Sequence, residues 1–167
     1  GHSFSARYFA DKFQQEHLPE CEYRNFPLES ILELPAMLEN HPELCGFNVT
    51  IPYKQEVIPY LTDLGGEARE IGAVNCVKIT PKGLFGYNTD AYGFQKSLLE
   101  LIGNKRPDAL ILGTGGASKA VAYVLKKLGI PFSFVSRQSG DNRLRQKARS
   151  YLWILKSQIV MTRITLE

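Results

Sequence analysis

The sequence contains few cysteines, no long hydrophobic run and no strong excess of charge of one sign. The three cysteines, Cys21, Cys45 and Cys76, are odd in number and far apart, so they indicate neither a disulfide framework nor a metal-binding cluster. No apolar run approaches the roughly 20 residues of a membrane-spanning helix, and the start of the chain does not resemble a signal peptide. We therefore expect no membrane partner and a reducing cytoplasm as the location.

Composition and charge exclude two further classes of protein. The formal net charge of +3 is too small by itself to indicate a nucleic-acid-binding protein. A hydrophobic fraction of 44% and a charged fraction of 22% are ordinary for a globular protein and exclude a disordered one. The histidines, His2, His17 and His41, lack the spacing of metal ligands, so no metal site is expected.

The hydrophobic pattern of the first hundred residues predicts a mixture of helices and strands. Apolar spacing and end signals predict helices over 4–17, 35–40, 52–61, 65–72 and 88–102. Runs rich in β-branched and aromatic residues predict strands over 21–27, 45–51, 73–79 and 83–88, the last two joined by a turn.

The polar, breaker-rich segment GNKRP at 103–107 is the predicted boundary between two domains. Beyond it, a strand over 108–113, a helix over 114–129 and a strand over 131–136 follow in the order typical of parallel α/β units. We therefore expect an α/β fold, with an N-terminal α/β substrate domain over 1–103 and a partial Rossmann-like nucleotide-binding domain over 104–167. The tail is compatible with one more helix and a β-like end.

The segment LILGTGGASKA places Gly113, Gly115 and Gly116 between a predicted strand and a predicted helix. Without side chains there, backbone N–H groups can approach a pyrophosphate closely, and the helix N-terminus favours its negative charge. Ser118 stands where a third glycine is usual, and it is small enough to substitute. The alternative is a tight turn in an α/β protein that binds no nucleotide.

The next predicted strand ends at Ser136 and Arg137. An NAD-binding site usually offers Asp or Glu there to the ribose hydroxyls, whereas an arginine suits a 2′-phosphate. These residues therefore favour NADP as the cofactor. The alternative for Arg137 is a solvated loop cation.

Four motifs of the first half, GHSFS, NVTIPYK, GAVN and GYNTD, place polar side chains at strand ends and helix starts, where substrates are usually held. Uncharged hydrogen-bonding side chains suit a polyhydroxylated ligand, and here they are Ser3, Ser5, Asn48, Thr50, Asn75 and Asn88. Lys54 and Asp90 are the strong acid–base candidates. Taken singly, each has a structural explanation: a serine caps the first helix, Asp90 interacts with a helix dipole, and Lys54 is solvated.

Together and in this order, GHSFS, GFNVTIPYK, IGAVN, GYNTDAYG and LGTGGASKA resemble the shikimate dehydrogenase family over residues 1 to about 137. The resemblance implies a two-domain α/β enzyme that reduces 3-dehydroshikimate to shikimate with NADPH in aromatic amino acid biosynthesis. It implies that Lys54 is the catalytic lysine and Asp90 its paired aspartate. The implied substrate-binding residues are Ser3, Ser5, Thr50 and Asn75. The implied cofactor-binding residues are Gly113, Thr114, Gly115, Gly116, Ala117, Ser118, Ser136 and Arg137.

These residue types fit a carbonyl reduction. When a hydride reaches a ketone carbon, the carbonyl oxygen gains negative charge and needs a proton. A lysine at hydrogen-bond distance supplies both charge and proton, and an adjacent carboxylate orients the amine. The catalytic alternative is a related dehydrogenase that acts on quinate or uses NAD.

The sequence departs from the family pattern at both ends. The strand that usually precedes the serine motif is absent, and beyond about residue 140 the sequence matches nothing expected of the family. We therefore expect a chain truncated at both ends, whose exposed apolar edges are either covered by a second copy in a homodimer or leave the chain poorly stable. The alternative from another functional class is a non-catalytic fragment that binds ligand weakly or serves as an assembly module.

Overall fold

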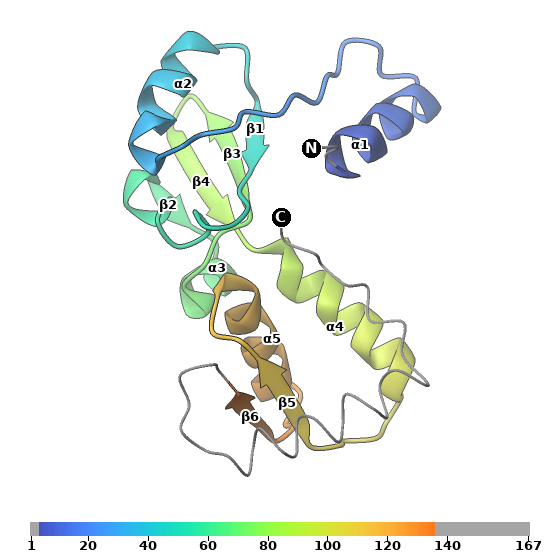
Figure 1. Ribbon diagram of the computed structural model, residues 1–167. Coiled ribbons are helices and arrows are strands. Elements are labelled where there is room, and N and C mark those ends of the chain that lie inside the picture. The colour runs from blue at the N-terminus through green and yellow to red at the C-terminus, as the bar shows by residue number, and fades with distance from the viewer. Residues whose placement is uncertain (1–3, 136–167) are drawn as a thin grey trace. The chain divides into compact units, whose positions relative to one another are not determined.

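The computed structural model describes residues 4–135 (Figure 1). The chain divides into two compact units between Pro42 and Glu43. The first unit contains the helix α1 (Phe4–Gln15), the short 3-10 helix η1 (Ile31–Glu33) and the helix α2 (Leu34–Asn40). Residues 1–3, which begin the serine motif, and residues 136–167, which include the predicted tail, lie outside the described residues.

Contacts between neighbouring residues accompany the helices of the first unit. In α1, Phe9 and Phe13 lie one turn apart with ring centroids 5.8 Å from each other, and Phe9 also stacks on Tyr23 at 4.9 Å. The start of η1 is a capping box. Ser30 Oγ accepts a hydrogen bond from Leu32 N at 3.3 Å, and Glu33 Oε1 accepts one from Ser30 N at 3.1 Å. Both predicted helices of this unit are confirmed.

The predicted strand over 21–27 is wrong, because residues 21–28 have no regular structure. A strand needs a neighbour that accepts and donates its backbone hydrogen bonds. The described part of the first unit contains no other strand. This segment therefore has no strand to pair with among the described residues of its own unit.

The second unit begins with a four-stranded sheet. Its strands are β1 (Gly46–Asn48), β2 (Asp63–Leu64), β3 (Cys76–Thr80) and β4 (Gly83–Tyr87), in the order β1-β3-β4-β2. The pairs β1–β3 and β3–β4 are antiparallel, and β2 runs parallel to β4. Three fully buried valines, Val57, Val74 and Val77, belong to its core.

The predicted helix over 52–61 is wrong. The chain instead forms successive turns that end in the 3-10 helix η2 (Ile58–Tyr60), after a cis peptide bond between Ile51 and Pro52. Pro59 has no N–H to donate to the carbonyl four residues earlier, and its ring would clash with that carbonyl, so a regular α-helix cannot run through the segment. The following helix α3 (Gly66–Ile71) confirms the prediction over 65–72 and ends at Gly72 with a left-handed φ of 68°.

The second part of this unit is a parallel β–α–β arrangement. The helix α4 (Thr89–Ile102) leads from the first sheet to β5 (Ala109–Leu112), which is followed by α5 (Gly116–Lys127) and β6 (Phe132–Val135). β5 and β6 pair in parallel, with Ala109 opposite Phe132. The predicted strand, helix and strand are therefore confirmed, as is the α/β fold class.

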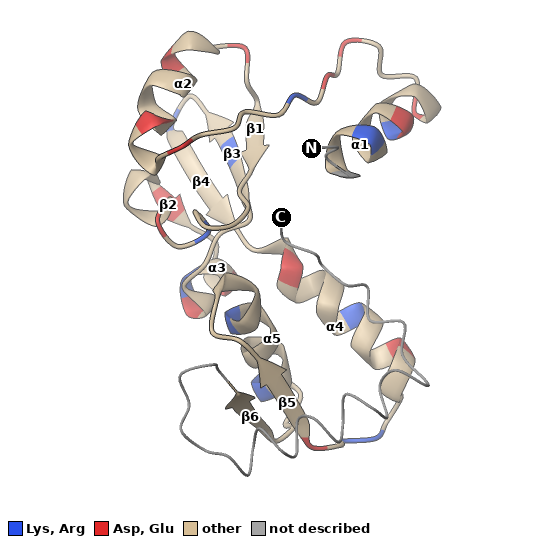
Figure 2. Cartoon of the chain, viewed as in Figure 1, with Lys and Arg blue, Asp and Glu red and all other residues tan. Residues whose placement is uncertain are grey.

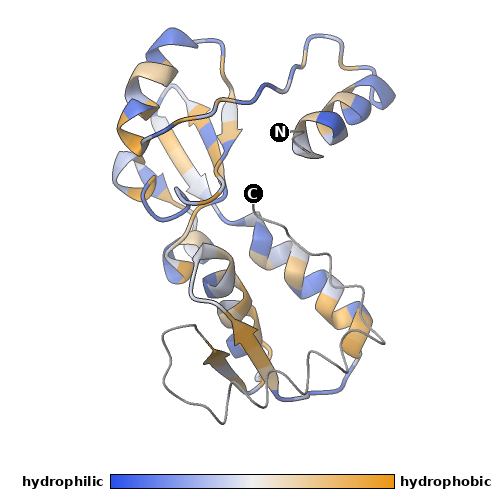
Figure 3. Ribbon diagram, in the orientation of Figure 1, coloured by the Kyte–Doolittle hydropathy of each residue, from blue (hydrophilic) through white to orange (hydrophobic). Residues whose placement is uncertain are grey.

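Apolar residues of these elements form two clusters. Ala73, Ala91, Ala120 and Val124 join the segment before β3 to α4 and α5, and Ile111, Leu125 and Ile130 join β5 to α5. Figure 3 shows β5 as hydrophobic along its length, whereas hydrophobic and hydrophilic residues alternate along α4 and α5. Both helices thus bury one face each, as amphipathic helices do.

Two further observations concern residues 4–135. No helix in this range is long and apolar enough to cross a membrane, and no group of three or more His, Cys, Asp or Glu side chains in it is arranged to hold a metal ion. The segment 103–107 lies inside the second compact unit, between α4 and β5. The functional domain boundary placed there stays a prediction.

Candidate active site

One end of the four-stranded sheet brings together three of the four polar motifs, NVTIPYK, GAVN and GYNTD. Asn48, the last residue of β1, pairs with Cys76, the first residue of β3, and Tyr87, the last residue of β4, also pairs with Cys76. The backbone continues this pattern, since Val49 N donates to Asn75 O at 2.9 Å and Asn75 N donates to Tyr87 O at 3.0 Å. The end of β1, the start of β3 and the end of β4 therefore meet at one edge.

Lys54 and Asp90 form an ion pair near this edge, although 36 residues separate them. Lys54 Nζ lies 2.9 Å from Asp90 Oδ2, and the two side chains are 16% and 35% exposed. Val74 N donates to the Lys54 carbonyl at 2.7 Å, which fixes the backbone of the lysine against the segment before β3. Because partial burial reduces screening by salt, the attraction between these two charges is stronger than that between the charges of a fully exposed pair.

The start of α4 holds Asp90 in place. Asn88 is its N-cap: Asn88 Oδ1 accepts from Ala91 N at 3.2 Å, while Asn88 Nδ2 donates to Ala73 O at 2.9 Å. Only 6% of Asn88 is exposed. Asp90 then lies in the first turn of α4, where a carboxylate interacts favourably with the helix dipole (Figure 2).

Asn75 forms hydrogen bonds with both Asp90 and Thr89, the first two residues of α4. Its Nδ2 group donates to Asp90 Oδ1 at 2.8 Å and to Thr89 Oγ1 at 2.9 Å. Its Oδ1 atom accepts from Thr89 N at 2.8 Å and from Thr89 Oγ1 at 3.2 Å. Both amide hydrogens and both acceptor positions of the oxygen are therefore engaged within the protein. Asn75 orients the Asp90 carboxylate from the side opposite Lys54.

The remaining predicted substrate residues lie in three places. Asn48 and Thr50 are exposed at the same sheet edge, and the Thr50 carbonyl accepts from Tyr53 N at 2.9 Å. Ser5 belongs to the first unit, in the first turn of α1. Ser3 lies outside the described residues. The hydrogen-bonded cluster itself is made of second-unit residues.

The glycine-rich turn connects β5 to α5, as its spacing predicts. Gly113 has a φ of +104°, a conformation that strongly favours glycine, and its N–H donates to Val135 O at 2.9 Å. Gly115 is the N-cap of α5, and a Cβ built there would meet no atom within 4 Å. Thr114, Ala117 and Ser118 complete the turn and the first turn of α5, with Ser118 Oγ near Gly113. Ser136 and Arg137 lie outside the described residues.

The sequence analysis did not identify two residues that make hydrogen bonds at or next to the site, Thr89 and Gln55. Thr89 makes three of the four side-chain hydrogen bonds of Asn75. Gln55 accepts a hydrogen bond from Lys119 Nζ at 2.6 Å. Thr89 stands inside the GYNTD motif, so its position beside Asp90 was a usable signal. Gln55 follows Lys54 directly, but nothing in the sequence indicates its partner.

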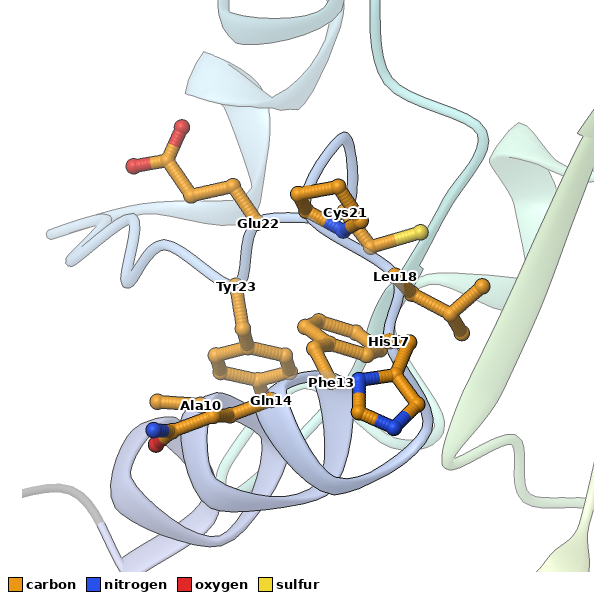
Figure 4. A pocket seen from close by; sticks show the side chains of 9 residues that line it. Ala10, Phe13, Gln14, His17, Leu18, Cys21, Glu22 and Tyr23 are labelled. Carbon is orange, nitrogen blue, oxygen red and sulfur yellow. The ribbon is translucent and has the colours of Figure 1, made fainter.

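An open pocket in the first unit lies between α1 and the segment that follows it (Figure 4). Its lining is mostly apolar, with Phe13, Leu18 and Tyr23 among the residues that face it. None of the residues predicted to bind substrate or cofactor lines this pocket.

Comparisons with known proteins agree with this architecture. Residues 1–77 match the family model described as the shikimate dehydrogenase substrate binding domain. A shikimate dehydrogenase (NADP(+)) from Staphylococcus haemolyticus is 37% identical over 130 residues, which cover 77% of this chain and 45% of that protein. The corresponding protein of Aquifex aeolicus is 53% identical over 85 residues, which cover 50% of this chain and 32% of that protein.

A solved structure shares the fold as well as the sequence. The shikimate 5-dehydrogenase of Thermus thermophilus, in complex with NADP(H) and shikimate, superposes with a TM-score of 0.69 at 36% identity, covering 82% of this chain and 52% of that one. The chain is therefore an α/β protein with an N-terminal substrate-binding domain and the start of a second, parallel sheet. The chain belongs to the shikimate dehydrogenase family. It spans about half or less of the length of these relatives.

Proposed function

We propose that this chain catalyses, or forms the catalytic part of an enzyme that catalyses, the reversible reduction of 3-dehydroshikimate to shikimate with NADPH. The observation that carries the proposal is the partly buried pair of Lys54 and Asp90, with 2.9 Å between Nζ and Oδ2. An ammonium group held this way is a proton donor of fixed direction. The family of the chain supports shikimate as the proposed substrate, since relatives carry the name shikimate dehydrogenase (NADP(+)).

The roles of the residues follow from the balance of the reaction. When bound, NADPH would supply the hydride that the carbonyl carbon of the substrate accepts. The Lys54 ammonium group donates a proton to the carbonyl oxygen as negative charge develops there, and the neutral amine then recovers a proton from water. In the reverse direction the neutral amine accepts the proton of the alcohol. Asp90 holds the amine in one orientation, while Thr50, Asn48, Ser5 and Ser3 are proposed to bind substrate hydroxyl and carboxylate groups. Asn75 was also predicted to bind substrate, and we propose that it orients the Asp90 carboxylate.

The glycine turn fits a dinucleotide. Gly115 leaves open space where a side chain would stand, and it has no side chain with which to cap the first N–H groups of α5. Such N–H groups favour phosphate oxygens. We propose that the residues from Gly113 to Ser118 hold the NADP pyrophosphate and that Ser136 and Arg137 bind the 2′-phosphate, which distinguishes NADP from NAD.

The test is the oxidation of shikimate by the parent chain with NADP, followed at the nicotinamide absorbance, beside Lys54→Ala and Lys96→Ala. Lys96 is an exposed lysine of α4 and serves as the matched control. We expect Lys54→Ala to lower kcat about 10²–10⁴-fold with NADP affinity retained, and Lys96→Ala to match the parent. Activity of Lys54→Ala within a few-fold of the parent would contradict the proposed role.

A second candidate function has its own observation: within residues 4–135 the second sheet has two strands, β5 and β6. On this reading the chain binds shikimate without turning it over. Calorimetry with shikimate, in the absence and presence of NADP, distinguishes binding from catalysis. Turnover with quinate or NAD in place of shikimate and NADP tests the remaining specificity.

The proposed homodimer is a separate question. Two large apolar side chains of the parallel sheet, Leu112 and Phe134, are 48% and 40% exposed. Apolar exposure of this kind is consistent with an additional covering surface. Light scattering at two protein concentrations gives the mass of the particle, and a mass of one chain at both concentrations would contradict the dimer.

A further inference from the structure

The first turn of α5 touches the catalytic candidate directly. Gly116, the first residue of the helix, is buried, and a Cβ built there would lie 3.1 Å from Lys54 Cβ and 3.5 Å from Lys54 Cδ. A separation of 3.1 Å is tighter than ordinary carbon–carbon contact, which is near 3.5–4.0 Å. A side chain at position 116 would therefore push the stem of Lys54 aside.

The same face of α5 also forms a hydrogen bond with Gln55, the residue that follows Lys54. Lys119 lies three residues after Gly116, so the two share one face of α5. Lys119 Nζ donates to Gln55 Oε1 at 2.6 Å. A cation in the first turn of a helix opposes the helix dipole, so helix stability does not explain a lysine at this position. Its hydrogen bond to the Lys54–Gln55 segment does.

Further along the face, α5 is fixed to α3. Lys127 Nζ lies 3.0 Å from Glu67 Oε1, and Tyr123 OH lies 3.4 Å from the same oxygen. Between these polar contacts, Ala120 belongs to the apolar cluster that also includes Ala73. The position of the first turn of α5 against Lys54 is therefore set by contacts along the whole helix.

We propose that the first turn of α5 positions the Lys54 ammonium group: Gly116 provides room for the stem of Lys54, and Lys119 anchors Gln55. Gly116 then serves two purposes, since its N–H belongs to the cofactor turn and its missing side chain lets Lys54 reach Asp90. Gly116, Lys119 and Gln55 are positioning residues. The inference rests on the proposed function of Lys54, but its geometry does not depend on turnover.

The test measures acetylation of Lys54 by limiting acetic anhydride at one fixed pH, without substrate or cofactor, with each lysine followed by mass spectrometry. The exposed Lys96 serves as the internal reference. In the parent, the ion pair with Asp90 protects the Lys54 amine. In Gly116→Val we expect labelling of Lys54 relative to Lys96 to rise about fivefold, the factor of a lost ion pair of ordinary strength.

The control variant is Gly93→Ala. Gly93 is also a helical glycine, and a Cβ built there meets no atom within 4 Å, so its Lys54 labelling should equal that of the parent. Should Gly116→Val not fold, Gln55→Leu and Lys119→Met provide the second measurement, since both residues make an exposed contact. We expect about a twofold rise in Lys54 labelling for each, and no further rise when the two are combined.

The outcomes separate this inference from the proposed function. Unchanged labelling in Gly116→Val, or in Gln55→Leu and Lys119→Met where the valine variant is unfolded, would overturn the positioning role even in a chain that oxidises shikimate. Raised labelling in a chain without turnover would support the positioning role and contradict the proposed catalysis. In an active chain, the positioning variants should lower kcat more than they raise the KM for shikimate.

Discussion

The most informative perturbation is at Asn88, because this side chain performs two separable tasks. Its oxygen caps α4 through Ala91 N, and its amide group satisfies the buried carbonyl of Ala73. Loss of an N-cap costs about 0.5–2 kcal/mol, and leaving a buried acceptor without its partner costs about 1–3 kcal/mol. Asn88→Ala removes both interactions, so we expect the free energy of unfolding to fall by about 2–4 kcal/mol.

Asn88→Ser separates the two contributions. A serine is a good N-cap, but its hydroxyl is too short to replace the amide that reaches Ala73. The serine variant should therefore lose only the carbonyl contribution and lie between the parent and Asn88→Ala. Urea denaturation, followed by circular dichroism and analysed with a common slope, gives the three free energies of unfolding.

Two results would refute this reasoning. Equal stability of the serine and alanine variants would mean that the cap contributes nothing, and a loss below about 0.5 kcal/mol in Asn88→Ala would place the residue among ordinary surface substitutions. The prediction is demanding because only 6% of Asn88 is exposed, so water cannot readily replace the lost amide.

Three further predictions concern other residues. Asn75→Ala removes the donor to Asp90 and the acceptor for Thr89 N, so unfolding free energy should fall by about 1–3 kcal/mol and shikimate oxidation should fall with it, as denaturation and steady-state kinetics can check. Gly86→Ala should cost about 1–3 kcal/mol by overpacking, because the added Cβ would lie 2.9 Å from a methyl group of the fully buried Val74; an unchanged urea midpoint would contradict it. Burial raises the pKa of the Cys76 thiol, so iodoacetamide should alkylate it more slowly than the exposed cysteines. Since the folded state keeps that proton to higher pH than the unfolded chain does, the thiol's contribution to stability is intact below its ordinary pKa and is lost as pH rises above it.

Local signals in the sequence were sufficient for the elements that carry the site. The N-cap Asn88 and the C-cap Gly103 predict the two ends of α4, and the turn from Gly113 to Gly116 predicts the start of α5. Each depends on a few neighbouring residues and on backbone preferences that act locally. The acid–base candidates could be recognised because they follow such boundaries.

Non-local pairing explains what the sequence did not predict. The segment 21–27 has β-type composition, but a strand exists only with a partner, and composition does not provide one. β2 consists of two residues, Asp63 and Leu64, and depends on β4 for its existence. The contacts of Asn75 and Gln55 span 14–15 and 64 residues, so they follow from sheet register and helix packing rather than from any local pattern.

The geometry of the Lys54–Asp90 pair is set by packing more than by the attraction between its charges. Ala91, next to Asp90, is 1% exposed, and Ala73, two residues before Asn75, is fully buried. Both belong to one apolar cluster with Ala120 of α5. Small side chains let α4, α5 and the segment before β3 approach closely, and the charged groups leave this cluster at its border. An ion pair with partial exposure contributes little stability by itself, so the cluster, rather than the pair, holds the two charges at 2.9 Å. Enlarging any of these alanines should therefore disturb the proton-transfer geometry even where both charged residues are intact.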